Sequence, residues 1–439
     1  MKTGMKVLVI GSGGREHALA WGLSRSDSVA AVHSAPGNPG MRRLGPVHDV
    51  AATDLEALGE LAAELKPDLV VIGPEAPLAL GLGDRLREDG FRVFGPGAAG
   101  AELEASKAFA KSFMARHGVP TAAFHTVNSV AEAERVLRSW QGPAVVKASG
   151  LAAGTGVLMC GNATEALAAA GSWLEGARFG TAGNTVVIEE TLEGPEASLF
   201  VVTDGNAYRL LPGAQDHKRA FDGDAGPNTG GMGAYSPAPV LDDAMLARVE
   251  ADVVRPTLDG LAADGIPFRG VLFVGLMLTA KGPQVLEYNV RFGDPETQAV
   301  LPLLQEDLGL LLHAAASGTL AALPEPPKPR GAAVCVVAAA GTYPESGSRG
   351  ARITGVEAAE AQGALVFHAG TALQETSLVT WGGRVLNAVG LGASLEEALD
   401  AAYRALGVIH FDGMRYRRDI ARRALPNPTP SWKGVAEHG

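Results

Sequence analysis

The sequence predicts a mixed protein with an N-terminal parallel α/β domain, a central α+β domain and a small C-terminal α+β domain. Three observations predict this fold class: strands and helices alternate over the first hundred residues, the pattern changes near residue 104, and prolines crowd residues 324–329. With 439 residues, the chain is long enough for about three domains. Its hydrophobic content of 46% and charged content of 19% are typical of a globular enzyme.

The N-terminal region alternates buried strands with helices. Residues 6–10, 68–73 and 91–94 are apolar enough for buried strands, and residues 16–24 and 55–65 have helical spacing. This alternation predicts a parallel sheet with helices on both faces, in which ligands bind beyond the carboxyl ends of the strands. The loops at those ends are residues 11–17, 36–38 and 73–78.

The loop at residues 11–17 is glycine-rich and leads into a helix. It departs from the dinucleotide-binding fingerprint, because Glu16 stands at the third glycine position and no acidic residue ends the second strand. A glycine-rich turn before a helix N-terminus suits a phosphate group, and a tight turn without a ligand is the alternative. The motif G-x-x-x-x-G-K-[ST] does not occur, which excludes a P-loop.

The central region has a different pattern. A helix at 105–117 precedes strands at 143–148, 156–160 and 185–190, and longer antiparallel strands follow within 197–289. This arrangement predicts an α+β domain.

Consecutive prolines at 324–329 cannot lie in a helix or a central strand, so they indicate a linker. Strands at 332–339 and 385–389 and a helix at 395–406 follow it. We therefore expect domains at 1–103, 104–328 and 329–439.

Composition excludes several classes of protein. The chain carries 48 acidic and 37 basic residues, a net charge of -11, which argues against a protein that wraps nucleic acid. The only cysteines, Cys160 and Cys335, lie in apolar runs, so we expect two buried thiols rather than a disulfide. The ten histidines form no zinc-ligand motif. No apolar run approaches the roughly 18 residues that span a membrane, and we expect a cytoplasmic protein.

The segment VLEYNVRFGDPETQ (residues 285–298) carries the strongest chemical signal. On a strand, Glu287, Asn289 and Arg291 share one face, while Leu286, Tyr288 and Val290 would face a core. Carboxylate and amide oxygens suit Mg²⁺, and a guanidinium suits phosphate or carboxylate. The segment therefore predicts a metal–phosphate site, with a solvated strand face as the alternative.

Three other segments also carry chemical signals. Lys147 lies in an apolar strand, where an unpaired ammonium is costly, and glycines follow it at 150, 154 and 156. Both features suit nucleotide phosphates, although a lysine beside a flexible hairpin is the alternative. A strand ending in Glu189 and Glu190, followed by Glu196, could hold adenine and ribose. The long segment 215–239 has no periodicity and is rich in polar residues, which is typical of a functional loop.

Taken in order, these segments resemble an ATP-grasp ligase. In detail the chain resembles the glycinamide ribonucleotide synthetase (phosphoribosylamine–glycine ligase) family of de novo purine biosynthesis. The resemblance runs nearly from end to end and rests on VLVIGSGGREHALAW, GPEAPL, SKAFAKSFMARHGVPTA, QDHKRAFDGDAGPNTGGMGAYSPAP, NVRFGDPETQ and FHAGT.

The resemblance implies an ATP-grasp core with a lid subdomain at about 122–192. It also implies a reaction in which glycine and 5-phosphoribosylamine are joined through glycyl phosphate, giving glycinamide ribonucleotide, ADP and phosphate. ATP and Mg²⁺ or Mn²⁺ are the implied cofactors. We expect a monomer, with an oligomer left open, and neither nucleic acid nor membrane as a partner.

The resemblance also implies roles for individual residues. The metal would be held by Glu287 and Asn289. Arg291 would stabilise the transferring phosphoryl group or acyl phosphate, and Asp216 and Asp294 would orient the amine substrates. The nucleotide would be contacted by Lys107, Lys147, Gly154, Gly156, Glu189, Glu190, Leu192 and Glu196. Phosphoribosylamine would be held by Gly13, Gly14, Arg15, Glu16, Pro36, Gly37, Asn38, Gly73, Pro74, Glu75 and Pro77.

The chain departs from the family pattern at three positions. Where the family usually has K-x-D-G-L-A-A-G-K-G, Ser149 replaces the aspartate and Thr155 replaces the loop lysine. Gly275 stands where many ATP-grasp enzymes carry a further metal-binding carboxylate, so the protein would supply two metal ligands.

These departures leave alternatives open. The chain could be another ATP-grasp purine enzyme, such as a carboxylase or formate-dependent transformylase, or a nucleotide-binding regulator without turnover. A nicotinamide dehydrogenase is a more distant alternative, opposed by Glu16.

Overall fold

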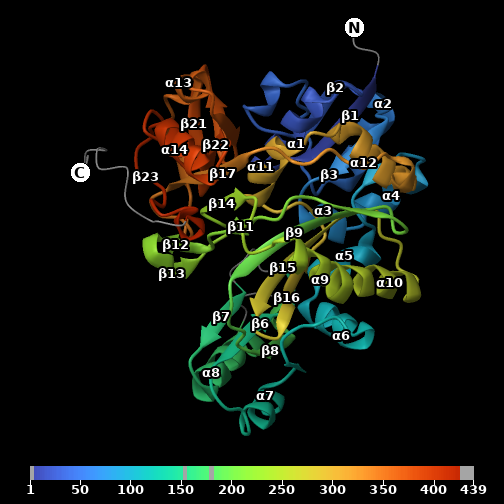
Figure 1. Ribbon diagram of the computed structural model, residues 1–439, viewed down its shortest axis with the longest axis vertical. Coiled ribbons are helices and arrows are strands. Elements are labelled where there is room, and N and C mark those ends of the chain that lie inside the picture. The colour runs from blue at the N-terminus through green and yellow to red at the C-terminus, as the bar shows by residue number, and fades with distance from the viewer. Residues whose placement is uncertain (1–3, 152–155, 177–181, 426–439) are drawn as a thin grey trace.

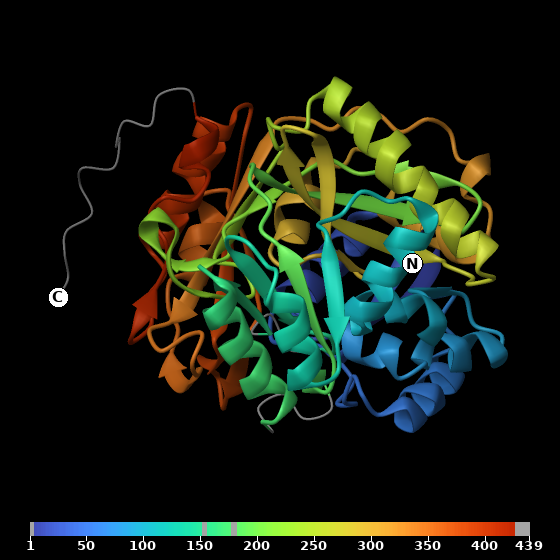
Figure 2. The same cartoon turned by 90° about the horizontal axis from the view of Figure 1, so that it is seen from below.

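The computed structural model describes residues 4–151, 156–176 and 182–425. Figure 1 shows the N-terminal region at the top, the C-terminal region at the upper left and a smaller lobe at the bottom. The lower lobe contains β5 to β8 with α7 and α8, and Figure 2 views the molecule from this side.

The N-terminal sheet is parallel and has the strand order β2–β1–β3–β4. Its strands are β1 (Met5–Gly11), β2 (Val29–Pro36), β3 (Leu69–Ile72) and β4 (Val93–Phe94). The helices of this region are α1 (Gly14–Arg25), α2 (Leu55–Leu65), α3 (Glu75–Ala79), α4 (Leu82–Glu88) and α5 (Ala98–Ala105).

Both faces of this sheet are buried under helices. Val7 and Val9 of β1 pack in one apolar cluster with α1 and α12 (Leu308–Ser317), whereas Leu8 and Ile10 pack in another with α2 and α4. A strand that is buried on both faces needs a continuous apolar run, which β1 has. The predicted parallel α/β arrangement is confirmed.

The lower lobe is an antiparallel sheet covered by two helices. Its strand order is β5–β8–β6–β7, and Ala133 of α7 and Trp173 of α8 pack in its apolar cluster. The elements are β5 (Phe124–Val127), α7 (Val130–Leu137), β6 (Ala144–Ala148), β7 (Val157–Cys160), α8 (Ala163–Leu174) and β8 (Val186–Glu190). Helix α6 (Lys107–His117) precedes the lobe in the chain.

A second antiparallel sheet lies between this lobe and the N-terminal region, in the order β10–β9–β15–β16. Its strands are β9 (Glu196–Thr203), β10 (Tyr208–Leu210), β15 (Gly270–Thr279) and β16 (Gly282–Asn289). The helices that accompany it in sequence are α9 (Asp243–Val249), α10 (Arg255–Ala263) and α11 (Glu296–Val300). Among the described residues no single helix could cross a membrane by length and composition, but the bent pair Glu296–Leu303 and Leu308–Ser317 meets that test.

The C-terminal sheet includes strands from the segment 215–239. Short strands β11 (Gln215–Asp216) and β14 (Gly233–Ser236) extend it through the pairing of β14 with β17 (Ala332–Ala340), and a hairpin of β12 (Arg219–Phe221) and β13 (Ala225–Asn228) lies between them in sequence. The other elements are β18 (Ser348–Arg352), α13 (Val356–Ala361), β19 (Leu365–His368), β20 (Thr371–Gln374), β21 (Ser377–Gly382), β22 (Arg384–Gly392), α14 (Leu395–Leu406) and β23 (Met414–Arg415). Both cysteines are buried and free, as predicted.

Candidate active site

Strand β16 contains a β-bulge close to the predicted metal ligands. Glu287 pairs with Gly275 of β15, but Val285 pairs with Leu276, so Leu286 is an extra residue on β16. Tyr288 and Val290 enter the apolar core as predicted, whereas Val285 takes the place predicted for Leu286. The prediction for Leu286 was therefore wrong, because strict alternation fails at a bulge.

Beyond the bulge, Asn289 and Arg291 lie together. Arg291 Nη2 donates a hydrogen bond to Asn289 Oδ1 at 2.8 Å, and it also lies 2.8 Å from Glu104 Oε1. The Arg291 Nε lies 3.4 Å from Oε2 of Glu75, the first residue of α3. The structure thus brings the end of β16 close to Glu75, one of the predicted substrate residues.

Glu104 was not predicted as a site residue. Its side chain is 8% exposed, and Oε2 accepts a hydrogen bond from the backbone N–H of Val290 at 2.8 Å. Burial raises the pKa of Glu104, and the Arg291 charge opposes that shift only in part. Its position at the end of α5 has no sequence signal, because only the tertiary packing brings it to Arg291.

Glu287 lies among four cations. Among the described residues, its carboxylate has neither an ion pair nor a hydrogen-bond partner. Burial favours its neutral form, but the charges of Lys218, Lys147, Lys107 and Arg291 outweigh burial and lower the pKa of Glu287. An ionised carboxylate without a direct partner is available to an ion or a ligand.

The predicted metal ligands provide one carboxylate and one amide oxygen. Gly275 faces Glu287 across the β15–β16 pair, so β15 adds no carboxylate there. Within the described ranges no group of three histidine, cysteine, aspartate or glutamate side chains could hold a metal. Two oxygens from the protein fit Mg²⁺, which usually keeps several waters and binds substrate phosphates as well.

Lys147 and Glu189 form a buried ion pair between neighbouring strands of the lower lobe. Lys147 Nζ lies 2.9 Å from Glu189 Oε2 and donates to the carbonyl oxygen of Leu286 at 3.2 Å. Lys111 Nζ lies 3.1 Å from the same glutamate oxygen, and burial lowers the pKa of Lys111 to about 8. In the part of the chain that the structure describes, the buried Glu189 Oε1 has no hydrogen-bond partner.

Lys111 was missed by the sequence prediction, although a signal existed. It follows Lys107 by four residues, so the two ammoniums share one face of α6. Lys107 Nζ lies 3.4 Å from the carbonyl oxygen of Gly150, and burial lowers its pKa while the Glu287 charge opposes the shift. The lobe and α6 together present three lysines toward the strand end.

Ser149 joins the lobe to the start of α6. Its hydroxyl accepts a hydrogen bond from the Ala108 N–H at 3.0 Å, and its carbonyl accepts one from the Lys107 N–H at 2.8 Å. The serine thus satisfies a free N–H at a helix N-terminus, a position that aspartate also favours. Gly156 immediately precedes β7, while the predicted contact Gly154 and the departure Thr155 lie outside the described residues.

The predicted adenine and ribose residues continue from the end of β8. Glu190 Oε1 accepts a hydrogen bond from the Ala123 N–H at 2.9 Å, and Leu192 is half-buried in the connection to β9. Glu196 Oε2 lies 2.9 Å from Lys218 Nζ, which lowers the pKa of Glu196 despite burial. The structure therefore shows the predicted ribose carboxylate in an ion pair.

Asp216 and Glu296 form a second acidic group beside this pair. Burial raises the pKa of both, to about 7 for Glu296, and the negative charge of Asp216 adds to the shift of Glu296. Glu296 Oε1 lies 3.4 Å from Ser198 Oγ. Asp216 was predicted as a substrate-orienting residue, but Glu296 was overlooked within NVRFGDPETQ.

Glu16 and Arg15 organise the glycine-rich loop. Glu16 Oε2 accepts a hydrogen bond from the Gly13 N–H at 2.7 Å, and Oε1 lies 2.5 Å from Arg15 Nε. A Cβ at Gly73 would lie 2.3 Å from Glu16 Oε1, and Gly11, with φ of 125°, is equally close to the Glu16 side chain. Glycine is required at both positions, because the glutamate packs between the two loops.

Asn38 connects the loop after β2 to the C-terminal region. Its amide nitrogen donates to the carbonyl oxygens of Ser12 at 2.8 Å and His368 at 2.9 Å, and its Oδ1 accepts from the Met41 N–H at 3.1 Å. The remaining predicted substrate residues lie in the same loops or at the starts of α1 and α3, namely Gly14, Pro36, Gly37, Pro74 and Pro77.

Asp294 completes the site from the side of the C-terminal sheet. Its Oδ2 lies 3.4 Å from Arg384 Nη2, and its Oδ1 accepts from Gln298 Nε2 at 2.7 Å. Burial raises its pKa, but the charges of Arg384 and Arg15 outweigh burial and lower it. A Cβ at Gly13 would lie 3.6 Å from Asp294 Oδ2, so Asp294 borders the glycine-rich loop.

Hydrogen bonds and ion pairs connect these groups across all three regions. The lysines lie around the Glu287 carboxylate, which has no partner among the described residues, and Arg291 contacts Glu75 at the start of α3. Such an arrangement suits phosphoryl transfer, which needs cations and positioning more than acid–base groups.

Comparison with known proteins agrees with this chemistry. The chain matches the N domain of phosphoribosylglycinamide synthetase over residues 5–104, its ATP-grasp (A) domain over 105–297 and its C domain over 333–423. The chain belongs to the phosphoribosylglycinamide synthetase family. This membership confirms the predicted family, the ATP-grasp fold and the predicted enzyme class, a phosphoribosylamine–glycine ligase of purine biosynthesis.

Individual members of the family are similar over almost their whole length. Phosphoribosylamine–glycine ligase of Caulobacter vibrioides is 50% identical over 96% of this chain and 99% of its own, and that of Chlorobaculum tepidum is 49% identical over 96% and 100%. The crystal structure of the Thermotoga maritima ligase has a TM-score of 0.82 and 37% identity, covering 94% of this chain and 99% of that one.

A more distant structure shares the fold alone. The biotin carboxylase domain of the 2-oxoglutarate carboxylase of Hydrogenobacter thermophilus has a TM-score of 0.70 at 17% identity, covering 94% of this chain and 92% of its own.

Proposed function

We propose that this member of the synthetase family joins glycine to 5-phosphoribosylamine with ATP, giving glycinamide ribonucleotide, ADP and phosphate. The observation that supports it most is the Glu287 carboxylate, which lies among four cations and has no partner among the described residues. That environment suits a nucleoside triphosphate and its metal, because the cations would offset the phosphate charge and the carboxylate would bind the metal ion close to the reacting phosphorus.

The proposed reaction has two steps. A carboxylate oxygen of glycine attacks the γ-phosphorus of ATP, the bond to the β-phosphate oxygen breaks, and ADP leaves. The nitrogen of phosphoribosylamine then attacks the carbonyl carbon of glycyl phosphate, phosphate leaves with the former carboxylate oxygen, and the nitrogen loses a proton. Each step needs anions held close together, which the surrounding lysines and Arg291 would favour.

Glu287 and Asn289 would hold the metal, Mg²⁺ or Mn²⁺, from the end of β16. The ion would neutralise charge on the transferred phosphoryl group when bound. Arg291 is ordered by Asn289, Glu104 and Glu75, so its guanidinium is positioned before a substrate arrives.

The nucleotide would lie between the lower lobe and the sheet of β10, β9, β15 and β16. Lys107 and Lys147 come from α6 and β6 and face Glu287, which suits contacts with phosphates. Glu189 and Glu190 come from the end of β8 and Leu192 from the connection to β9, and backbone groups at such a strand end suit an adenine edge. For Glu196 to take ribose hydroxyls, its ion pair with Lys218 would have to be shared with or exchanged for the nucleotide.

Phosphoribosylamine would bind at the N-terminal loops. The N-terminus of α1 follows Gly13, and helix N-termini favour phosphate. Glu16 and Asn38 are committed to hydrogen bonds within the protein, so they would position the loops rather than contact the substrate. Asp216 and Asp294 lie on the two sides of the site and would orient the amines.

A phosphate-release assay tests the proposal. We expect ATP-dependent release only when glycine and phosphoribosylamine are both present, with loss on omitting either one. Bicarbonate or formate in place of glycine is the matched control, and neither should support release. Turnover that needs bicarbonate or formate would replace the proposal with a carboxylase or transformylase, and ATP binding without turnover under any combination would indicate a regulator.

A further inference from the structure

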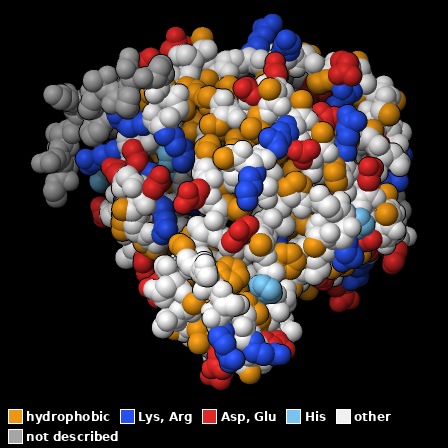
Figure 3. Space-filling view, turned by 60° about the horizontal axis from the view of Figure 1, so that its bottom comes forward, with side chains coloured by type: hydrophobic (Ala, Val, Ile, Leu, Met, Phe, Trp, Pro, Cys, Tyr) orange, Lys and Arg blue, Asp and Glu red, His pale blue; other side chains and the backbone are white. Residues whose placement is uncertain are grey.

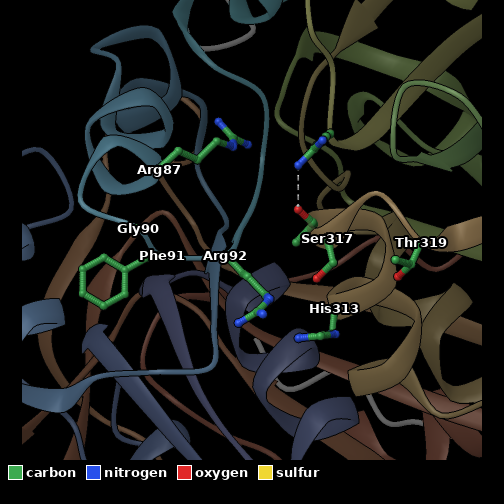
Figure 4. A pocket seen from close by; sticks show the side chains of 9 residues that line it. Arg87, Gly90, Phe91, Arg92, His313, Ser317 and Thr319 are labelled. Carbon is green, nitrogen blue, oxygen red and sulfur yellow. Dashed lines mark hydrogen bonds between the residues drawn. The ribbon is translucent and has the colours of Figure 1, made fainter.

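A second charged cavity lies outside the candidate active site. It has a volume of about 640 Å³, within the range of small-molecule pockets. Figure 4 shows Arg87 and Arg92 on one side and His313, Ser317 and Thr319 on the other. We call it the basic pocket, lined by Arg87, Gly90, Phe91, Arg92, Arg269, His313, Ala316, Ser317 and Thr319.

The basic pocket lies beside β4, the edge strand of the N-terminal sheet, whereas the proposed substrate loops follow the carboxyl ends of β1, β2 and β3. Arg92 directly precedes β4, which runs parallel to β3 with Val93 opposite Val70. The loops that end in Gly13 and Gly73 follow β1 and β3, at the carboxyl edge. A ligand in the basic pocket would therefore not occupy the site proposed for phosphoribosylamine.

Three arginines meet in this pocket, whose lining among the described residues contains no carboxylate. Across the described ranges, none of the ion pairs involves Arg87, Arg92 or Arg269. Two carboxylates lie near the pocket, since the Asp84 charge opposes the lowering of the Arg87 pKa and the Asp68 charge opposes that of the His313 pKa. Both accept backbone hydrogen bonds, Asp84 Oδ2 from the Ala98 N–H at 2.7 Å and Asp68 Oδ2 from the Lys6 N–H at 2.8 Å. In a chain of net charge -11, this local excess of positive charge is unusual.

Two of the guanidiniums are held in place by backbone carbonyls. Arg87 Nη2 donates to the carbonyl oxygen of Val93 at 3.2 Å, and Arg269 Nη1 donates to that of Ala316 at 3.3 Å. Burial lowers the pKa of Arg87, the Asp84 charge opposes this shift, and the like charge of Arg269 adds to it. The fold thus keeps two cations close together at an energetic cost that a bound anion would relieve.

Other polar groups of the pocket are also available to a ligand. Arg92 is exposed, and its guanidinium has no side-chain or carbonyl partner among the described residues. The buried Ser317 hydroxyl has no hydrogen-bond partner among the described residues, and His313 faces the Arg92 charge from α12. These groups come from three segments distant in sequence, as is common for ligand sites between packed units.

We propose that the basic pocket binds a small anion that carries two or more phosphate groups. Guanidiniums bind phosphate oxygens through paired, charge-assisted hydrogen bonds. Three guanidiniums carry more positive charge than a ligand with a single carboxylate would neutralise. The hydroxyl of Ser317 can donate one further hydrogen bond to such an anion. The proposal is independent of the reaction at the active site.

Calorimetric titration with inorganic pyrophosphate tests this proposal on the whole chain. Arg92→Gln and Arg269→Gln each remove one charge while keeping a polar side chain of similar length. Arg404→Gln, an exposed arginine on α14, is the matched control for the loss of one charge. Lys147→Ala reports any pyrophosphate bound at the proposed nucleotide site instead.

We expect Arg92→Gln and Arg269→Gln each to weaken pyrophosphate binding by about tenfold. Arg404→Gln should leave it unchanged, and Lys147→Ala should retain the binding event that the Arg92→Gln change weakens. Equal affinity in the wild type and both pocket variants would overturn the proposal. Loss of all binding in Lys147→Ala alone would overturn it as well, since pyrophosphate would then occupy only the nucleotide site.

Discussion

The end of β16 and the first turn of α1 place carboxylates in opposite situations. Glu16 is bonded to the Gly13 N–H and to Arg15, so its charge is used within the protein at the start of α1. Glu287 has no direct partner among the described residues, and its charge is balanced by four surrounding cations. Because a polar group that is already satisfied gains little from a ligand, the first residue shapes the site and the second is free to bind.

Neutralising Glu287 should have the largest effect on activity. We expect Glu287→Gln to keep the fold and to lower kcat by about 1,000-fold, because a neutral amide replaces an anionic metal ligand. Steady-state kinetics at saturating and limiting Mg²⁺ would measure the effect. Glu193→Gln, an exposed glutamate, is the control. Normal turnover of Glu287→Gln at limiting Mg²⁺ would show that the assignment is wrong.

A second prediction concerns the buried acid Glu296. Its pKa is raised to about 7 in the folded chain, from 4.5 when unfolded, so its contribution to stability is complete below pH 4.5 and is lost as the pH rises through 7. The free energy of unfolding of the wild type should fall over this window by about 3 kcal/mol relative to Glu296→Gln.

Denaturant unfolding of both proteins at pH 4.5, 6 and 8 would check the Glu296 prediction. A difference between the two proteins that does not change with pH would contradict it. Ser198→Ala serves as a control, because it removes the neighbouring hydroxyl without removing a titrating group.

Asn38, like Glu16, is expected to hold the structure of the site and not to bind a ligand. Asn38→Ala removes hydrogen bonds to Ser12, His368 and Met41, and should lower the free energy of unfolding by about 2 kcal/mol. Asn206→Ala, at an exposed position, should change it little. If Asn38→Ala kept full stability but lost affinity for phosphoribosylamine, Asn38 would contact the ligand and would not serve mainly to hold the loop in place.

The smallest effect is expected at Thr155, which lies outside the described residues. Thr155→Lys restores the charge of the family pattern and should tighten ATP binding by about 1 kcal/mol without being needed for turnover. Calorimetry and kinetics would be compared with Thr126→Lys, which adds the same charge elsewhere on the lower lobe. An inactive wild type that Thr155→Lys rescues would show that Thr155 is a defect.

Regular patterns in the sequence predicted the elements that follow them. Continuous apolar runs predicted β1 and β3, and the period of two predicted the shared face of Glu287 and Asn289. The bulge at Leu286 was not predictable in this way, because one extra residue breaks the alternation without leaving a sequence signal.

The site residues that were not predicted from the sequence depend on tertiary contacts. Segment 215–239 has no period, yet β14 pairs with β17 about a hundred residues later, and this pairing fixes where the segment lies. Glu104 and Arg384 become site residues only because packing brings them to Arg291 and Asp294. Lys111 was accessible in principle, since it lies four residues after Lys107 on one helix.

Oxygen transfer from glycine to phosphate tests the proposed chemistry most directly. With glycine whose carboxylate is labelled with ¹⁸O, attack on the γ-phosphorus would carry one labelled oxygen into the phosphate released after amide formation. We expect mass spectrometry of that phosphate to show one ¹⁸O for each glycinamide ribonucleotide formed. Unlabelled phosphate released alongside the same product would mean that no glycyl phosphate forms, and would contradict the role assigned to the site around Glu287.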